Sequence, residues 1–103
     1  MPRYEIVQQE QRPGHDGFSR LLEWLDDGVE SHGERYVEMR RRLVSYFDRR
    51  NRLSPADLAN ETFDRIGKVL TKNGMTAATP PARYCYVVAK GVLAEDVARE
   101  PVR

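Results

Sequence analysis

The stretch SPADLANETFDRIGKVL, residues 54–70, decides the fold that we expect for this chain. Its apolar side chains recur at intervals of three and four residues, which is the spacing of one face of an α-helix. Ser54 is a favoured N-cap, Pro55 suits the first helical position and Asp57 takes the capping-box place. The stretch therefore predicts an amphipathic helix. Its expected core face consists of Leu58, Thr62, Phe63, Ile66, Val69 and Leu70.

The opposite side of this predicted helix is almost entirely acidic, although the chain is rich in arginine. It carries Asp57, Asn60, Glu61 and Asp64. Side chains three and four residues apart lie on one helical face, from which carboxylates can pair with the cations of a partner. An acidic residue in the first turn is also explained as a cap. The acidic face alone therefore does not identify a function.

Length and composition indicate one small globular domain. The chain has 103 residues, of which 40% are hydrophobic and 32% charged, and this suits one modest core in a soluble helical protein. No apolar run approaches the roughly 20 residues of a membrane span, and the N-terminus lacks the apolar centre of a secretory signal. We therefore expect a cytoplasmic protein. The single cysteine, Cys85, excludes an internal disulfide.

Helical spacing predicts three further helices, over residues 16–27, 33–50 and 82–99. Gly28 suits the end of the first helix, and Pro101 stops the last one. The side chains expected to face the core are, in chain order, Phe18, Leu21, Leu22, Leu25, Tyr36, Met39, Leu43, Val44, Tyr46, Phe47, Tyr84, Val87, Val88 and Val92.

The remaining segments are expected to be irregular. Residues 1–15 contain few apolar side chains and are interpreted as a flexible N-terminal lead-in. TKNGMTAATPP, residues 71–81, is interpreted as a loop because Asn-Gly and Pro-Pro interrupt it. No strand-like alternation or internal repeat is present in the sequence. The expected fold class is all-α, a compact bundle of about four helices over residues 16–100.

Charge is unevenly distributed along the chain, although the net charge is only +1. Residues 16–30 carry five acids and one arginine, whereas residues 31–53 carry seven arginines and three acids. Such segregation suits two differently charged partner surfaces. Ordinary solvated helix faces also segregate charge in this way, so the charge pattern alone does not indicate a function.

Residues that support catalysis are not grouped in the sequence. His15 and His32 are far apart and have too few neighbouring ligands to suggest a metal site. Cys85 lies among aromatic residues and is expected to pack rather than to act as a nucleophile. The chain has no glycine-rich phosphate loop. We therefore expect a binding protein, not an enzyme, with no cofactor and no metal.

The order Asp-Leu-Ala-Asn-Glu-Thr-Phe-Asp-Arg-Ile at residues 57–66 is more specific than a generic helix. It resembles the Asp-Leu-x-Gln-Glu-x-Phe-x-Arg-hydrophobic run of region 2 in bacterial RNA polymerase sigma factors of the extracytoplasmic-function group. The segments RRRLVSYFDRR (40–50) and PARYCYVVAKGVLAED (81–96) are similar to the preceding and following segments of that region, and LLEWLDDG (21–28) to its opening helix. Together they cover residues 18–99 in the family's order.

The resemblance implies a sigma region 2-like bundle that binds core RNA polymerase. In the family, the polar face of the helix at residues 54–70 docks on the coiled-coil clamp helices of the largest polymerase subunit. The matching polymerase-binding residues here are Asp57, Asn60 and Glu61, with Asp64 or Arg65 at the rim. The family usually has Gln at the position of Asn60. The shorter amide keeps its donor and acceptor but loses reach.

The resemblance also implies that the following loop and the exposed face of the last helix capture partly single-stranded −10 promoter DNA, with a flipped base held near the loop. The candidate DNA-binding residues are Lys72, Asn73, Arg83, Tyr84, Tyr86 and Lys90. Aromatic faces can stack on bases while Lys and Arg neutralise phosphates. Tyr84 and Tyr86 cannot face the same way on a helix, so at least one of them is expected in the core.

Several residues depart from the family pattern and suggest weak DNA affinity. Lys90-Gly91 stands where the family commonly has Arg-Asn, and Gly costs about 1 kcal/mol of helix propensity relative to Ala. Glu95, Asp96 and Glu100 are acidic where a phosphate-binding helix is usually more basic. The alternative function is therefore a degenerate region 2 that acts as a regulatory or interaction module, for example with an anti-sigma protein, without DNA recognition.

A second helical domain is a further feature that the resemblance implies. In the family, this domain carries a helix-turn-helix that recognises the −35 promoter element. The sequence does not extend over such a domain. We therefore expect either a domain excised from a longer sigma factor or a free-standing region 2 protein with altered function.

Overall fold

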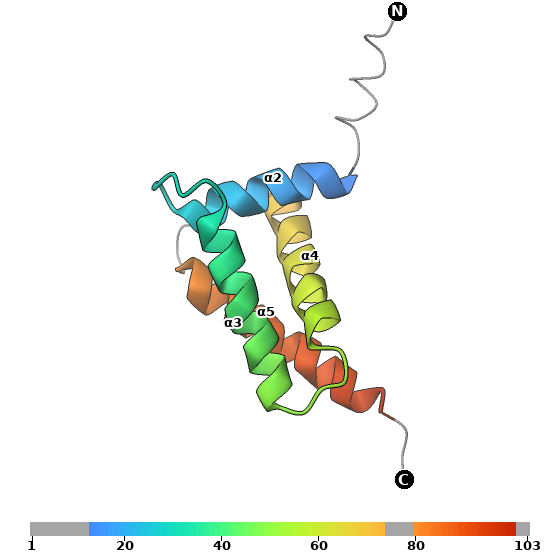
Figure 1. The fold of residues 1–103 in the computed structure, drawn as a ribbon. Helices are drawn as coiled ribbons and strands as arrows, with labels where there is room; N and C mark the ends of the chain where they lie inside the picture. The colour runs from blue at the N-terminus through green and yellow to red at the C-terminus, as the bar shows by residue number, and fades with distance from the viewer. Residues whose placement is uncertain (1–12, 74–79, 101–103) are drawn as a thin grey trace, which may run out of the picture.

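The computed structural model describes residues 13–73 and 80–100, which form four α-helices without any strand. The helices are α2 (Pro13–Asp26), α3 (Glu34–Arg49), α4 (Pro55–Asn73) and α5 (Pro81–Ala98). In Figure 1, α2 lies across one end of α3 and α4, and α5 crosses behind them. Helix α4 packs against each of the other three helices. The expected all-α bundle is confirmed, with the helix at residues 54–70 at its centre.

The core forms where the apolar face of α4 meets the other helices. Of the six core positions expected on α4, five are buried and Val69 is half-buried. The buried hydrophobic residues are Leu21, Trp24 and Leu25 of α2, Met39, Leu43 and Phe47 of α3, Leu58, Ala59, Phe63, Ile66 and Leu70 of α4, and Cys85, Ala89 and Val92 of α5. Thr62 fits among them because its hydroxyl donates to the Leu58 carbonyl at 2.8 Å.

Local sequence sets the ends of the first two helices. Helix α2 ends at Asp26 and is followed by Gly28 with a φ of 87°, a left-handed conformation that glycine adopts without strain. Helix α3 ends at Arg49, and Asn51 adopts a φ of 59°. The amide of Arg52 then donates to the Phe47 carbonyl at 3.2 Å, which closes the end of α3 and turns the chain towards α4.

Four expectations about these helices were wrong in detail. Residues 13–15, expected in the lead-in, belong to α2. Val87 was expected in the core, but it is 57% exposed and Cys85 and Ala89 are buried instead. Phe18 is 45% exposed and packs edge-on against Tyr36 with the ring centroids 5.2 Å apart. The loop expected from residue 71 begins later, because α4 continues to Asn73. Most of that loop, residues 74–79, and the lead-in up to residue 12 lie outside the described residues.

Candidate docking and nucleic-acid-binding surfaces

Helix α4 presents a strip of polar side chains on the side opposite the core, here called the α4 strip: Asp57, Asn60, Glu61, Asp64 and Arg65. Asp57, Asn60 and Asp64 are exposed, whereas Glu61 and Arg65 are half-buried. The strip follows from the helical repeat, because the buried residues of α4 occupy the other side. All five residues that the sequence indicated for polymerase binding therefore lie on one outward face.

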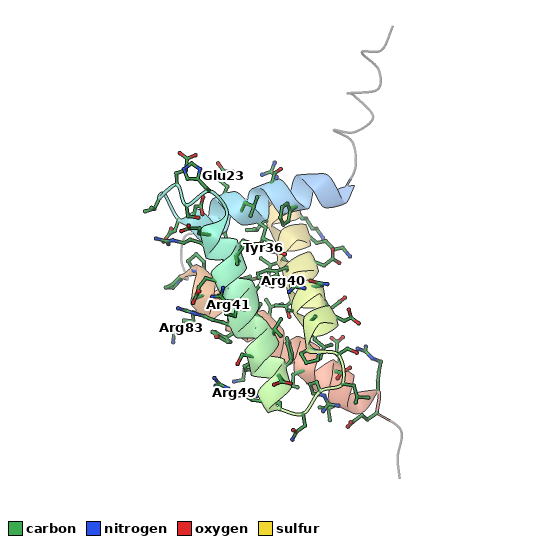
Figure 2. All side chains as sticks on the ribbon, in the orientation of Figure 1. Glu23, Tyr36, Arg40, Arg41, Arg49 and Arg83 are labelled. Atoms are coloured by element: carbon green, nitrogen blue, oxygen red, sulfur yellow. The ribbon has the colours of Figure 1, made fainter. Side chains whose placement is uncertain are left out.

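Two links across helices border the α4 strip. On one edge, Arg40 of α3 donates from Nη2 to Asn60 Oδ1 at 3.0 Å, and Figure 2 shows Arg40 between α3 and α4. On the other edge, Arg65 donates to Glu61 of its own helix at 2.8 Å and to both carboxylate oxygens of Glu95 on α5, at 3.0 and 2.5 Å. These links fix how the strip is oriented relative to α3 and α5.

The Arg65 pairs shift the protonation equilibria of their members. Hydrogen bonds to Glu95 and then to Glu61 raise the pKa of Arg65 above its ordinary value. The Arg65 guanidinium, by hydrogen bonding and charge, lowers the pKa of Glu95. Both groups are therefore charged at neutral pH, and the link between α4 and α5 is ionic.

Replacing Glu95 by glutamine is expected to lower stability at neutral pH and to make less difference in acid. The folded-state pKa of Glu95 is depressed, so its contribution is present above the unfolded value of about 4.5 and is lost as pH falls through the folded value. Urea unfolding of both proteins at pH 7, 5, 4 and 3 measures this. The same exchange at exposed Glu23 controls for net charge. If the difference in free energy of unfolding between Glu95→Gln and wild type stayed constant down to pH 3, the result would contradict an ion pair between Glu95 and Arg65.

The candidate DNA-binding residues divide between α4 and α5. Lys72 is exposed on the last turn of α4, and Asn73 is the last residue of that helix, so both are helical rather than in the loop. Arg83 and Lys90 are exposed on α5. The structure places Arg83 and Lys90 on one face of α5, whereas Tyr84 and Tyr86 point to different sides of that helix and Lys72 lies at the end of α4.

Both candidate tyrosines are half-buried and pack against aromatic residues of other helices. Tyr84 meets Trp24 of α2 edge-on, with ring centroids 5.7 Å apart. Tyr86 meets Tyr46 of α3 at 5.6 Å, with the rings inclined by 55°. At least one of the two was expected in the core; both pack against the buried core from its edge, and neither is among the fully buried residues.

The acidic end of α5 is explained by contacts within the chain. Arg52, in the connection between α3 and α4, has a side chain only 8% exposed. It binds Asp96 through Nε at 2.9 Å and Glu100 through Nη2 at 2.7 Å. Glu95 is bound to Arg65 as described above. The three acids that departed from the family pattern therefore attach α5 to the rest of the bundle, and sequence reasoning missed both arginines as their partners.

Two open cavities lie beside these surfaces. One, of about 1040 Å³, is formed by the α2–α3 connection, the first half of α3 and the beginning of α5, with Leu25, Met39 and Pro81 in its lining. The other, of about 520 Å³, lies on α3 next to the α4 strip. Its lining combines Tyr36 and Val44 with Arg40. The second cavity therefore adds an apolar and basic area to the edge of the acidic strip.

Cys85 packs in the core, and the described residues hold no candidate metal site. Burial raises the pKa of the Cys85 thiol to about 12, so the side chain is a packed thiol rather than a thiolate. Among residues 13–73 and 80–100, no group of three or more His, Cys, Asp or Glu is placed to hold a metal ion. The same residues contain no helix with the length and apolar character needed to cross a membrane.

The fold places the chain in the class of small all-α bundles. Comparison with family models, with curated proteins and with solved structures gives no match. The resemblance to sigma region 2 therefore depends on the order of residues in the segments quoted above. Whether the α4 strip and the exposed face of α5 act as that resemblance implies is a matter for proposal and test.

Proposed function

We propose that this chain is a sigma region 2-like module that docks on RNA polymerase in the cytoplasm and holds the unwound −10 promoter strand. One observation carries the proposal. The residues of α4 that match the family's polymerase-docking positions are on the outside of the bundle, and the residues between them form the core. One segment thus supplies both the bundle's centre and an outward polar strip.

The chemistry of the α4 strip suits a protein partner that presents cations. Asp57 and Asp64 lie along its middle and both are exposed, and Asp64 is also paired with Lys68 of its own helix at 3.2 Å. Arginines of a partner helix can bind such carboxylates with charge-assisted, two-pronged hydrogen bonds. Charge complementarity of this kind orients the partners and speeds their encounter. The cavity at Tyr36 and Val44 offers the partner apolar contacts beside the charged ones.

The promoter strand is assigned to the side of α5. Arg83 and Lys90 are exposed there and can neutralise phosphates. In this proposal a base that has left the stack enters the cavity beside the beginning of α5, whose lining combines Leu25 and Pro81 with three arginines and four acidic residues. In this proposal the chain uses binding energy to hold a melted strand, and the polymerase supplies the chemistry.

Retention on immobilised bacterial core RNA polymerase tests the docking strip. The variant Asn60→Ala/Glu61→Arg is expected to bind at least tenfold more weakly than wild type, because it removes the amide and places a cation where the partner presents cations. Glu23→Arg is the matched control, since it makes the same charge reversal at an exposed side chain of α2. Circular dichroism checks that all three proteins are folded. Equal retention of wild type and the α4 variant would overturn the docking proposal.

A further inference from the structure

Tyr46 and Tyr86 join α3 and α5 through an aromatic pair at the bundle surface. Their ring centroids are 5.6 Å apart, and both side chains are half-buried. Tyr46 also meets the fully buried Phe47 edge-on at 5.2 Å, which fixes its ring. Because the pair is anchored in the core on one side and reaches solvent on the other, it offers a rigid aromatic surface.

Two arginines of α3, and Arg50 directly after its last residue, surround Tyr46. Arg42 precedes it by four residues, and Arg49 and Arg50 follow it by three and four, so all three are its neighbours on one face. The guanidinium of Arg50 lies over the Tyr46 ring, 3.8 Å from its centroid, and Nη1 donates to the Tyr46 carbonyl at 3.0 Å. Arg50 is therefore held over the ring.

Two cations of α5 stand in the same relation to Tyr86. Arg83 precedes it by three residues and Lys90 follows it by four. In Figure 2, Arg49 of α3 and Arg83 of α5 project along the same edge of the bundle. The tyrosine contact thus joins two helix faces that each carry cations, although these faces are more than thirty residues apart in sequence.

Acidic residues compensate only a small part of this charge. Glu38 binds Arg42 at 3.2 Å and also binds Arg41 at 2.7 Å. Asp48 lies on a different side of α3, where it lines the cavity with Tyr36 and Val44. The surface around the tyrosines is therefore positive, whereas the α4 strip is mainly acidic.

We propose that this tyrosine surface binds single-stranded nucleic acid along a track that runs from α5 onto α3. Its members are Tyr46, Tyr86, Arg42, Arg49, Arg50, Arg83 and Lys90. Cations that flank aromatic side chains are the pattern of single-strand binding, in which phosphates are neutralised and bases stack. Arg49, Arg83 and Lys90 supply the phosphate contacts. The guanidinium of Arg50, held over Tyr46, supplies a planar face for a base.

This inference deepens the proposed function, and it rests on that function only for the identity of the strand. The α5 residues were already assigned to DNA, but the arginines of α3 and Tyr46 were not. The track does not require polymerase, because every group in it belongs to this chain. Strand binding and polymerase docking can therefore be tested separately.

Fluorescence anisotropy with a labelled 20-nucleotide oligothymidylate tests the track. Arg49→Glu is expected to weaken binding about tenfold at low salt, and Arg49→Ala to reduce the slope of log K against log salt by about 0.7, the value for one phosphate contact on a single strand. Lys68→Glu is the matched control, because it reverses an exposed cation on α4. Equal binding by Arg49→Glu, Lys68→Glu and wild type would overturn the extension onto α3.

A second comparison tests the stacking part. Arg50→Lys keeps the charge but removes the planar group, so it is expected to weaken binding of oligothymidylate about fivefold and binding of an abasic strand of equal length much less. If wild type bound the abasic strand as tightly as oligothymidylate, the surface would be a general polyanion site and the stacking assignment would be wrong. Circular dichroism of each variant confirms that the helices are intact.

The two proposals fail in different ways. Strand binding that depends on Arg49, without retention on polymerase, would support the track and contradict the docking function. Retention on polymerase with strand binding that is lost on Arg83→Ala and Lys90→Ala but unchanged by Arg49→Glu would support the proposed function and overturn the track. No binding of the strand at low salt would overturn the track and favour an interaction module without DNA recognition.

Discussion

Replacing Phe47 by alanine is expected to destabilise the bundle by about 3–5 kcal/mol, the usual cost of removing a buried aromatic ring and leaving a cavity. Phe47 is fully buried at the end of α3, and its ring also supports Tyr46. Domains of this size are stable by about 5–15 kcal/mol. The substitution therefore removes a large share of the free energy of unfolding, and we expect the variant to be partly unfolded at 37 °C.

Urea unfolding followed by circular dichroism measures this loss. Val87→Ala is the control, because Val87 is apolar but mostly exposed, and a surface substitution of this kind stays within about 0.5 kcal/mol. Helical spacing predicted both side chains in the core. The comparison therefore also tests the structure, in which Phe47 is buried and Val87 is exposed. A cost below about 1 kcal/mol for Phe47→Ala would contradict its position in the structure.

Helix α4 could be predicted from sequence because only one of its sides is apolar. Leu58, Phe63, Ile66 and Leu70 repeat with helical spacing, and polar residues fill the other side. When the two faces differ this clearly, the period alone gives both the buried side and the outward strip. The position of the α4 strip could be predicted for the same reason. Its contacts with Arg40 and Glu95 could not be predicted, because these residues belong to other helices.

Helix α5 was harder because apolar residues occur on both of its sides. Val87 and Val97 are exposed, whereas Cys85 and Ala89 are buried. Spacing therefore favours two alternative core faces, and the packing against α3 and α4 selects the one with small side chains. Trp24 was overlooked for a related reason. It lies between the leucines of α2 and is buried against Tyr84, a contact that depends on where α5 passes.

The ion pairs between distant residues were beyond sequence reasoning. Arg52 and Asp96 are separated by 44 residues, and Arg65 and Glu95 by 30. Periodicity along one helix predicts which residues share a face, but it does not give the angle at which two helices cross. Since α5 crosses behind α3 and α4, its acidic end reaches both arginines (Figure 1). Glu95, Asp96 and Glu100, which suggested weak DNA binding in the sequence, thus attach α5 to the other helices through ion pairs.

Replacing Arg52 by alanine is expected to destabilise the bundle by about 2 kcal/mol. Two hydrogen bonds between charged groups are lost, and each contributes about 1.5–3 kcal/mol when well shielded. Arg52 is shielded, but Asp96 and Glu100 are partly exposed and their side chains can return to water, so the sum is reduced. Arg99→Ala is the control, because exposed Arg99 approaches Asp96 only at 3.8 Å, and it is expected to cost less than about 0.5 kcal/mol.

The loss at Arg52 should be concentrated at the end of α5. Urea unfolding gives the total, and amide hydrogen exchange of residues 95–100 shows where the opening occurs, because a helix end without its attachment opens locally. Added salt should reduce the difference in free energy of unfolding between Arg52→Ala and wild type, since it screens the partly exposed ion pairs of Arg52. If Arg52→Ala unfolded at the same urea concentration as wild type, with unchanged exchange, then Cys85, Ala89 and Val92 alone would fix α5. In that case the ion pairs at the acidic end of α5 would not contribute to the orientation of Arg83 and Lys90.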